Sequence, residues 1–269
     1  MTESEWLVSA DPSAMLEQLR ISRLGVASDR KLRLFAVACC RMIWHLLTDP
    51  RSQRAVEVAS LYADGLATLQ ELMTAHDRAS SVALNGWFEG ELAWKVSAEN
   101  VEVLTQNSGL PRWFSVSTKY ASQQAAILRD IIGNPFRPVT LPRKSVRCKQ
   151  CKGKGEFLSR ADRGPEHMLL CPPCKGVGFI QGDCPWLTPT VRALAEASYW
   201  ETSQGVLSDD RLAVLADAIE EAGCDNHELL QHLRGWERWS ETTGWTGWRR
   251  RTLPHFRGCW ALDAILGKG

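Results

Sequence analysis

The chain has 269 residues, of which 44% are hydrophobic and 23% are charged, and its formal net charge is +1. This length and apolar content allow a substantial buried core, so one globular body with one small inserted module is the simplest organisation. The near-zero charge argues against a chain that binds nucleic acid or membranes through its overall charge. No run approaches the roughly eighteen apolar residues of a membrane span, and the N-terminus MTESEWLVSADP lacks the basic and apolar regions of a secretory signal. We therefore expect a cytoplasmic protein with no membrane contact.

Capping residues and apolar spacing predict a series of helices in the first part of the chain. Ser28 is a candidate N-cap for a helix that runs to about Leu47, and Asp49 followed by Pro50 starts another that Gly65 ends. Further helices are expected at about 68 to 84, 88 to 106 and 116 to 132. Strand-like alternation is scarce. The predicted fold class is therefore mainly α, an antiparallel helical array or bundle, with 1–143 as its N-terminal region.

The pattern changes at 133–147, GNPFRPVTLPRKSVR, where three prolines predict a loop that leads into an inserted module at 144–182. Within the module, CKQCKGKGEF and CPPCKGVGFI both follow the pattern C-x-x-C-x-G-x-G. One C-x-x-C turn brings two thiolates to one point, so two turns complete a tetrahedral zinc site, and the glycines accept backbone angles that a Cβ resists. We predict a small β-hairpin module that binds one structural Zn²⁺ through Cys148, Cys151, Cys171 and Cys174.

Two alternatives for this module stay open. The cysteines can form a redox dithiol pair, because the lysines at 149, 152 and 175 can lower a thiol pKa, although a second matching C-x-x-C makes this less economical. Cys184 or His167 can also replace one of the four ligands.

The remaining cysteines and histidines predict no catalytic site. Cys39 and Cys40 are expected to be small core residues, and the segment from Cys224 to His227 is expected to be a helix start rather than a nucleophile beside its base. The other histidines form no H-x-x-x-H or H-E-x-x-H pair, and so predict no catalytic zinc. They are His45, His76, His232 and His255.

After the module, helices are predicted at about 188 to 203, from Ser208 to about Ala222, and from Asp225, followed by a last short helix in CWALDAIL. These form a C-terminal helical region, 183–269, that packs on the first. A Trp/Arg-rich loop, 235–252, interrupts it with GWERWSETTGWTGWRRR. The loop either binds a partner through its tryptophans and arginines or covers the core beneath it.

The repeated phrase resembles, position for position, the repeat of the cysteine-rich domain of DnaJ-type chaperones. That family carries four repeats and two zinc ions, whereas CKQCKGKG and CPPCKGVG are two repeats, enough for one ion. The His-Pro-Asp tripeptide of a J domain and a Gly/Phe linker do not occur in the sequence. The resemblance implies a zinc-bound twisted hairpin with protein binding as its role, and it does not imply co-chaperone activity.

The remainder of the chain resembles an uncharacterised family of bacterial proteins that is abundant in planctomycetes. The resemblance rests on segments that include SDRKLRLFAVACCRMIWHLL, NPFRPV, WLTPTV and HFRGCWALDAIL. In that family NPFRPV is followed closely by WLTPTV, so the cysteine module and the Trp/Arg segment are both insertions here. The resemblance implies an architecture but no activity.

The distribution of charge bears on the choice of partner. Between Arg137 and Lys175, ten lysines and arginines accompany only three acidic residues. The predicted function is recognition of a protein partner through the zinc hairpin. The first alternative is nucleic-acid binding through the basic module and the Trp/Arg segment. The second alternative is an enzyme whose active site is not visible in the sequence. If the two insertions lie side by side, they form one composite site. The candidate binding residues are Arg143, Lys144, Arg147, Lys149, Lys152, Lys154, Lys175, Trp236, Trp239, Trp245, Trp248, Arg249, Arg250 and Arg251.

Overall fold

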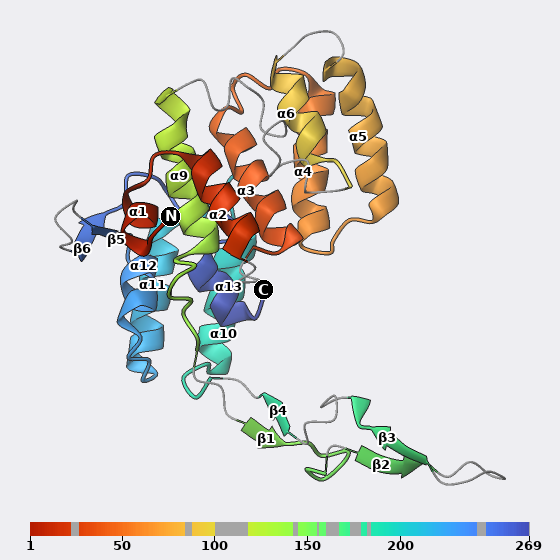
Figure 1. Ribbon diagram of the computed structural model, residues 1–269, viewed down its shortest axis with the longest axis vertical. Coiled ribbons are helices and arrows are strands. Elements are labelled where there is room, and N and C mark those ends of the chain that lie inside the picture. Colours follow the sequence, from red (N-terminus) through yellow and green to blue (C-terminus); the bar gives the residue numbers. More distant parts are fainter. Residues whose placement is uncertain are drawn as a thin grey trace.

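The computed structural model describes residues 1–22, 27–83, 88–99, 118–141, 145–154, 156–159, 167–172, 179–181, 184–240 and 246–268. Within these ranges the chain is mainly helical, as predicted (Figure 1). The helices before the module are α1 (Glu3–Val8), α2 (Pro12–Ser22), α3 (Asp29–Met42), α4 (Pro50–Ala63), α5 (Leu69–Ala83), α6 (Phe88–Val96) and α9 (Thr118–Ile132). The helices after it are α10 (Pro189–Trp200), α11 (Asp209–Glu221), α12 (His227–Leu233) and α13 (Trp260–Leu266).

Local capping chemistry sets several of the helix starts. The side chains of Ser28, Asp49, Thr188 and Ser208 each accept a hydrogen bond from a backbone N–H in the first turn of the helix that follows. The helix α12 is capped by Asn226, one residue later than the Asp225 start expected from the sequence.

The helix α3 ends before the predicted Leu47. After Met42 the backbone continues with bonds to the third residue back, such as Ile43 N to Cys40 O at 3.2 Å, which tighten the last turn. Ile43 and Leu47 are nevertheless buried, so the apolar periodicity continues past the end of the α-helix. The helix expected at 88 to 106 also ends early, at Val96, and residues 100–106 lie outside the described ranges.

Two hydrophobic clusters make up the helical body. The first is built by the helices before the module, with Trp6 and Phe35 among its largest buried side chains. Trp6 also donates its indole N–H to the backbone oxygen of Gly133 at 3.1 Å. The second cluster is built by α10 to α13 around Tyr199, Leu215 and Leu262. The C-terminal helices therefore pack as a unit with its own core.

A buried ion-pair network joins the two clusters. Arg30, on α3, contacts Asp263, on α13, at 2.6 Å and Asp64, the C-cap of α4, at 3.0 Å. The hydroxyl of Tyr199 on α10 donates to Asp64 at 2.6 Å, and Lys31 Nζ lies 2.7 Å from Asp263. This network connects helices from both halves of the body through paired charges.

The inserted module consists of two antiparallel strand pairs, β1 (Ser145–Arg147) with β4 (Phe179–Gln181) and β2 (Glu156–Ser159) with β3 (His167–Leu170). The register pairs Ser145 with Gln181 in the first and Phe157 with Leu169 in the second. Figure 1 shows β1 to β4 extending from the end of the body where α10 lies, away from the strands β5 and β6. The cysteine module and the Trp/Arg segment therefore do not form one composite site.

The Trp/Arg segment is a β-hairpin, and the prediction of a loop at 235–252 was wrong. The strand β5 (Trp236–Ser240) pairs antiparallel with β6 (Thr246–Arg250), with Arg238 opposite Trp248. Tryptophan and threonine favour strands, but apolar and polar residues do not alternate strictly here, so the period of two was not visible. The hairpin packs beside α1 and α12.

Candidate functional site

The two cysteine turns bring three sulfur atoms together. Cys148 and Cys151 occupy the turn after β1, and Cys171 follows directly after β3. Their sulfurs lie within 4.8 Å of one another and are buried. Cys174, the fourth predicted ligand, lies in 173–178, outside the described residues.

The separation of the sulfurs fits a metal better than a disulfide. Cys148 Sγ lies 3.7 Å from Cys171 Sγ. A zinc–sulfur bond of about 2.3 Å sets neighbouring sulfurs of a tetrahedron about 3.8 Å apart, whereas a disulfide bond is about 2.05 Å long. The side chains of Cys148 and Cys171 are fully buried. Reactive redox cysteines are usually partly exposed, so the burial argues against the redox alternative.

The glycine of the repeat has the backbone role expected from the sequence. Gly153, in the position C-x-x-C-x-G of the first copy, has φ of +84°. A Cβ at this position would also lie 3.0 Å from Cγ of Arg147. The turn is closed by Gly153 N to Cys148 O at 3.2 Å and by Lys154 N to Cys151 O at 3.0 Å. This geometry keeps the two cysteines of the turn on one side.

Cys184, one of the two alternative ligands, is not at this site. Cys184 is buried in the second hydrophobic cluster with Trp186 and Tyr199, so it belongs to the body. His167 pairs through its backbone with Ser159, and its side chain lies outside the description.

The described cations of the module are exposed. No carboxylate in the described ranges forms an ion pair with them. They lie around the first cysteine turn and are Arg147, Lys149, Lys152 and Lys154. The other three predicted module cations, Arg143, Lys144 and Lys175, lie outside the described residues.

Arg249, Arg250 and Arg251, at the end of the Trp/Arg segment, each contact another residue of the protein. Arg249 pairs with Glu237 at 2.8 Å, and Arg250 lies over the Trp236 ring at 4.6 Å. Arg251 pairs with the fully buried Asp130 at 2.9 Å. These contacts leave the three arginines less available for phosphate than the sequence suggested. Trp245 lies outside the described residues.

The hairpin also closes one side of a pocket of about 360 Å³. Trp236 and Trp248 line it together with Trp6 of α1 and Trp260 of α13, whereas Trp239 is not among its lining residues. Arg129 also lines the pocket, and its guanidinium donates to the backbone oxygens of Trp6 and Ser9. Burial lowers the pKa of Arg129 to about 10. The volume lies within the range of small-molecule sites, about 300 to 1,000 Å³.

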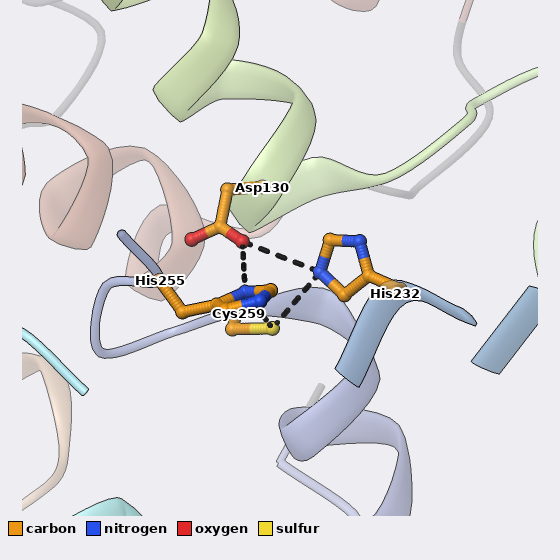
Figure 2. A group of neighbouring side chains, drawn as sticks. All are labelled: Asp130, His232, His255 and Cys259. Carbon is orange, nitrogen blue, oxygen red and sulfur yellow. Dashed lines mark hydrogen bonds and ion pairs between the residues drawn. The ribbon is translucent and has the colours of Figure 1, made fainter. Parts of the chain in front are cut away.

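A second group of residues that could hold a metal ion lies next to this pocket. Figure 2 shows Asp130, on α9, facing His232 of α12, His255 of the loop before α13, and Cys259, the N-cap of α13. One atom of each side chain lies within 4.8 Å of the corresponding atom of the others, and all four residues are buried. His232 and Arg251 line the pocket and also contact Asp130, so they connect the pocket with this cluster.

Burial and charge set the ionisation of the cluster. Burial alone raises the pKa of Asp130, but Arg251 and His255 outweigh it and hold that pKa well below its usual value. Burial lowers the pKa of His232 to about 3, so its imidazole is neutral at neutral pH. Burial, together with the nearby Asp130 carboxylate, raises the pKa of the Cys259 thiol. The Nε2 atom of His255 is buried and has no hydrogen-bond partner in the described structure.

The histidine spacings in the sequence did not bring His232 and His255 together, although in the structure both belong to a group that could hold a metal ion. The two histidines are 23 positions apart and lie on different elements, so a search for paired histidines on one helix does not find them. The spacing H-x-x-x-C from His255 to Cys259 was the available local signal. The positions of Asp130 and His232 depend on tertiary packing.

The fold and these groups define a mainly helical protein with two candidate metal-binding clusters. Comparison of the chain with protein-family models, curated protein sequences and solved structures gives no match. Among the described helices, none has both the length and the apolar character needed to cross a membrane.

Proposed function

We propose that the protein is a recognition protein whose cysteine module is folded around one structural Zn²⁺ and binds a protein partner. The observation that carries the zinc assignment is the convergence of three buried sulfurs from the two cysteine turns. Cys148, Cys151 and Cys171 would hold the ion, with Cys174 as the fourth thiolate. Four thiolates leave no open coordination position, so the role of this zinc is structural.

The need of the module for a metal supports this assignment. The described strands β1 to β4 are three or four residues long, and Cys148, Cys151 and Cys171 form a buried cluster beside them. Two-stranded hairpins of this size are not stable alone in water. A structural zinc site contributes on the order of 10 kcal/mol to folding near neutral pH, which is enough to stabilise the module.

The exposed surface of β3 supports a protein as the partner. Leu169 is 46% exposed and Leu170 is 69% exposed. Successive strand residues face opposite sides, so each face of the β2–β3 hairpin presents a leucine to solvent. A two-stranded sheet also has unpaired edges that an extended peptide can join. We infer that the partner is an extended, apolar protein segment. The resemblance to the DnaJ-type cysteine-rich domain agrees with this role.

Nucleic acid is the second candidate partner. The observation in its favour is the group of four exposed cations around the first cysteine turn, Arg147, Lys149, Lys152 and Lys154, without paired carboxylates in the described ranges. The protein partner is favoured because Arg249, Arg250 and Arg251 of the second insertion interact within the protein.

Metal analysis of the purified full-length protein tests the zinc assignment. Replacing Cys148→Ser together with Cys171→Ser should remove one equivalent of zinc per chain relative to the wild type. The matched control is Cys40→Ser, which changes a buried cysteine of α3 outside the module and should leave the zinc content unchanged. A double variant that keeps the wild-type zinc content would overturn the assignment.

A further inference from the structure

The candidate ligand atoms of the cluster beside the Trp-lined pocket lie slightly closer together than the ligands of a tetrahedral zinc site. Asp130 Oδ1 lies 2.8 Å from His255 Nδ1 and 3.2 Å from His232 Nε2. Cys259 Sγ lies 3.2 Å from the same Nε2 and 3.6 Å from the same Nδ1. Zinc bonds of about 2.0 to 2.3 Å place ligand atoms of a tetrahedron about 3.3 to 3.7 Å apart. The four atoms therefore face one common point, and they would admit one ion after moving apart by up to about 0.5 Å.

The way the imidazoles are oriented separates a metal site from a catalytic triad. In a nucleophile–histidine–acid triad, one ring nitrogen faces the nucleophile and the other faces the acid. Here His232 turns one nitrogen, Nε2, toward both Asp130 and Cys259, and His255 does the same with Nδ1. A single ring nitrogen has either a proton or a lone pair, so it cannot donate to the carboxylate and accept from the thiol at once. A metal uses both nitrogens as ligands together.

We propose that Asp130, His232, His255 and Cys259 bind a second divalent transition-metal ion, and that zinc fits them best. One thiolate, two imidazoles and one carboxylate are the ligand types that zinc takes in proteins. Binding displaces the thiol proton of Cys259 and leaves both imidazoles neutral. The assignment rests on this cluster alone and is independent of the zinc in the cysteine module.

Neighbouring groups hold the carboxylate in place. The second oxygen of Asp130, Oδ2, accepts the backbone N–H of Phe256 at 2.9 Å. Arg251 Nη1 forms an ion pair with Oδ1 at 2.9 Å, so a positive charge lies beside this carboxylate. Such contacts fix the direction in which a ligand presents its donor atom.

Four protein ligands make the site closed, which points to a structural role. The ligands come from α9, α12 and the segment that leads into α13. The ion would therefore fasten a helix of the first hydrophobic cluster to two elements of the second.

Metal content in three proteins tests the proposal. The full-length wild type should contain two zinc ions per chain, and the Cys148→Ser, Cys171→Ser variant should retain one. Adding Cys259→Ala to that variant should remove the remaining ion, whereas adding Cys40→Ala, at another buried cysteine, should not. A folded double variant without metal overturns the second site. A different result is that the wild type and the double variant both contain one ion, and that Cys259→Ala removes it. In that case the second site stands and the module assignment fails.

Cobalt substitution gives a test that needs no change in the cluster. Co²⁺ added to the metal-depleted double variant should show visible bands of tetrahedral coordination, with a sulfur-to-cobalt charge-transfer band of one thiolate. The wild type should show a several-fold stronger charge-transfer band because the module adds four thiolates. Octahedral cobalt bands alone, or none, in the folded double variant would overturn the proposal. Circular dichroism establishes that each variant is folded.

Discussion

The carboxylate oxygen Oδ2 of Asp263 lies 2.6 Å from Nη1 of Arg30, although the two residues are 233 positions apart in the chain. The Asp263 side chain is 2% exposed and the Arg30 side chain is 15% exposed. Lys31 shares the same oxygen, so one buried carboxylate balances two adjacent cations of α3. This arrangement makes the folded body sensitive to the loss of a single charge.

We expect Asp263→Asn to lower the free energy of unfolding by about 3 to 5 kcal/mol, because Lys31 then keeps no carboxylate partner in a buried position. Chemical denaturation of the purified protein measures the change. Asp217→Asn is the control. That residue is 66% exposed and pairs with Arg234, and its loss should cost less than about 1 kcal/mol. Equal effects of the two substitutions would contradict the assigned role of the buried pair.

Two glycines allow backbone strain to be separated from close packing. Gly258 and Gly205 both have a positive φ, of +92° and +80°. A Cβ added at Gly258 would lie 2.8 Å from Leu34 Cδ1, whereas a Cβ added at Gly205 would have no atom within 4 Å among the described residues. Gly205→Ala should cost about 1 to 2 kcal/mol through strain. Gly258→Ala should cost at least about 1 kcal/mol more through overpacking. Thermal or chemical unfolding compares the two, and a smaller effect at Gly258 would show that Leu34 moves away freely.

The protein-partner proposal predicts that the leucines of β3 dominate peptide binding. Immobilised peptides of graded apolar content are the probe, and the wild type should bind the apolar ones preferentially. Leu169→Asp with Leu170→Asp should reduce this binding at least tenfold, which is about 1.4 kcal/mol, without loss of zinc. Leu66→Asp is the control, because Leu66 is 58% exposed on the helical body. Binding that ignores apolar content, or that survives the β3 substitutions, would reject the proposal.

The nucleic-acid alternative predicts a strong dependence on salt. If the four cations around the first cysteine turn contact phosphates of a random-sequence single strand, the slope of log K against log salt should be about −0.7 for each contact. Changing Arg147, Lys149, Lys152 and Lys154 to glutamine should then flatten the slope and weaken binding. Fluorescence titration at low and moderate salt measures both. Undetectable binding at both salt concentrations would exclude this partner.

Local chemistry explains what the sequence could predict about the fold. The caps at Ser28, Asp49, Thr188 and Ser208 depend on residues three or fewer positions away, so they are visible without tertiary information. The turn role of the glycine at 153 is local in the same way. The mainly helical class follows from these signals and from the apolar periodicity.

Other features depend on packing between distant segments. The strands β5 and β6 carry no strict alternation, and they are held by pairing with each other and by contact with α1 and α12. Asp130 and His232 approach each other only because the fold brings α9, α12 and the segment around His255 to one place. The residues of the buried cluster lie on different elements, so no local sequence spacing predicts the cluster. The two cysteines of each C-x-x-C pair lie close together in the chain, so their spacing is visible in the sequence.

The register of β1 with β4 has a consequence for the architecture. Because Ser145 lies opposite Gln181, the chain leaves the body and returns to it at neighbouring points, and Leu141 and Trp186 on either side pack in the same hydrophobic cluster. If the cysteine module is deleted, a short linker can therefore join the two ends of the chain, and the helical body should still fold. The same junction should tolerate replacement of the module by another hairpin, because the two ends of the chain lie opposite each other there.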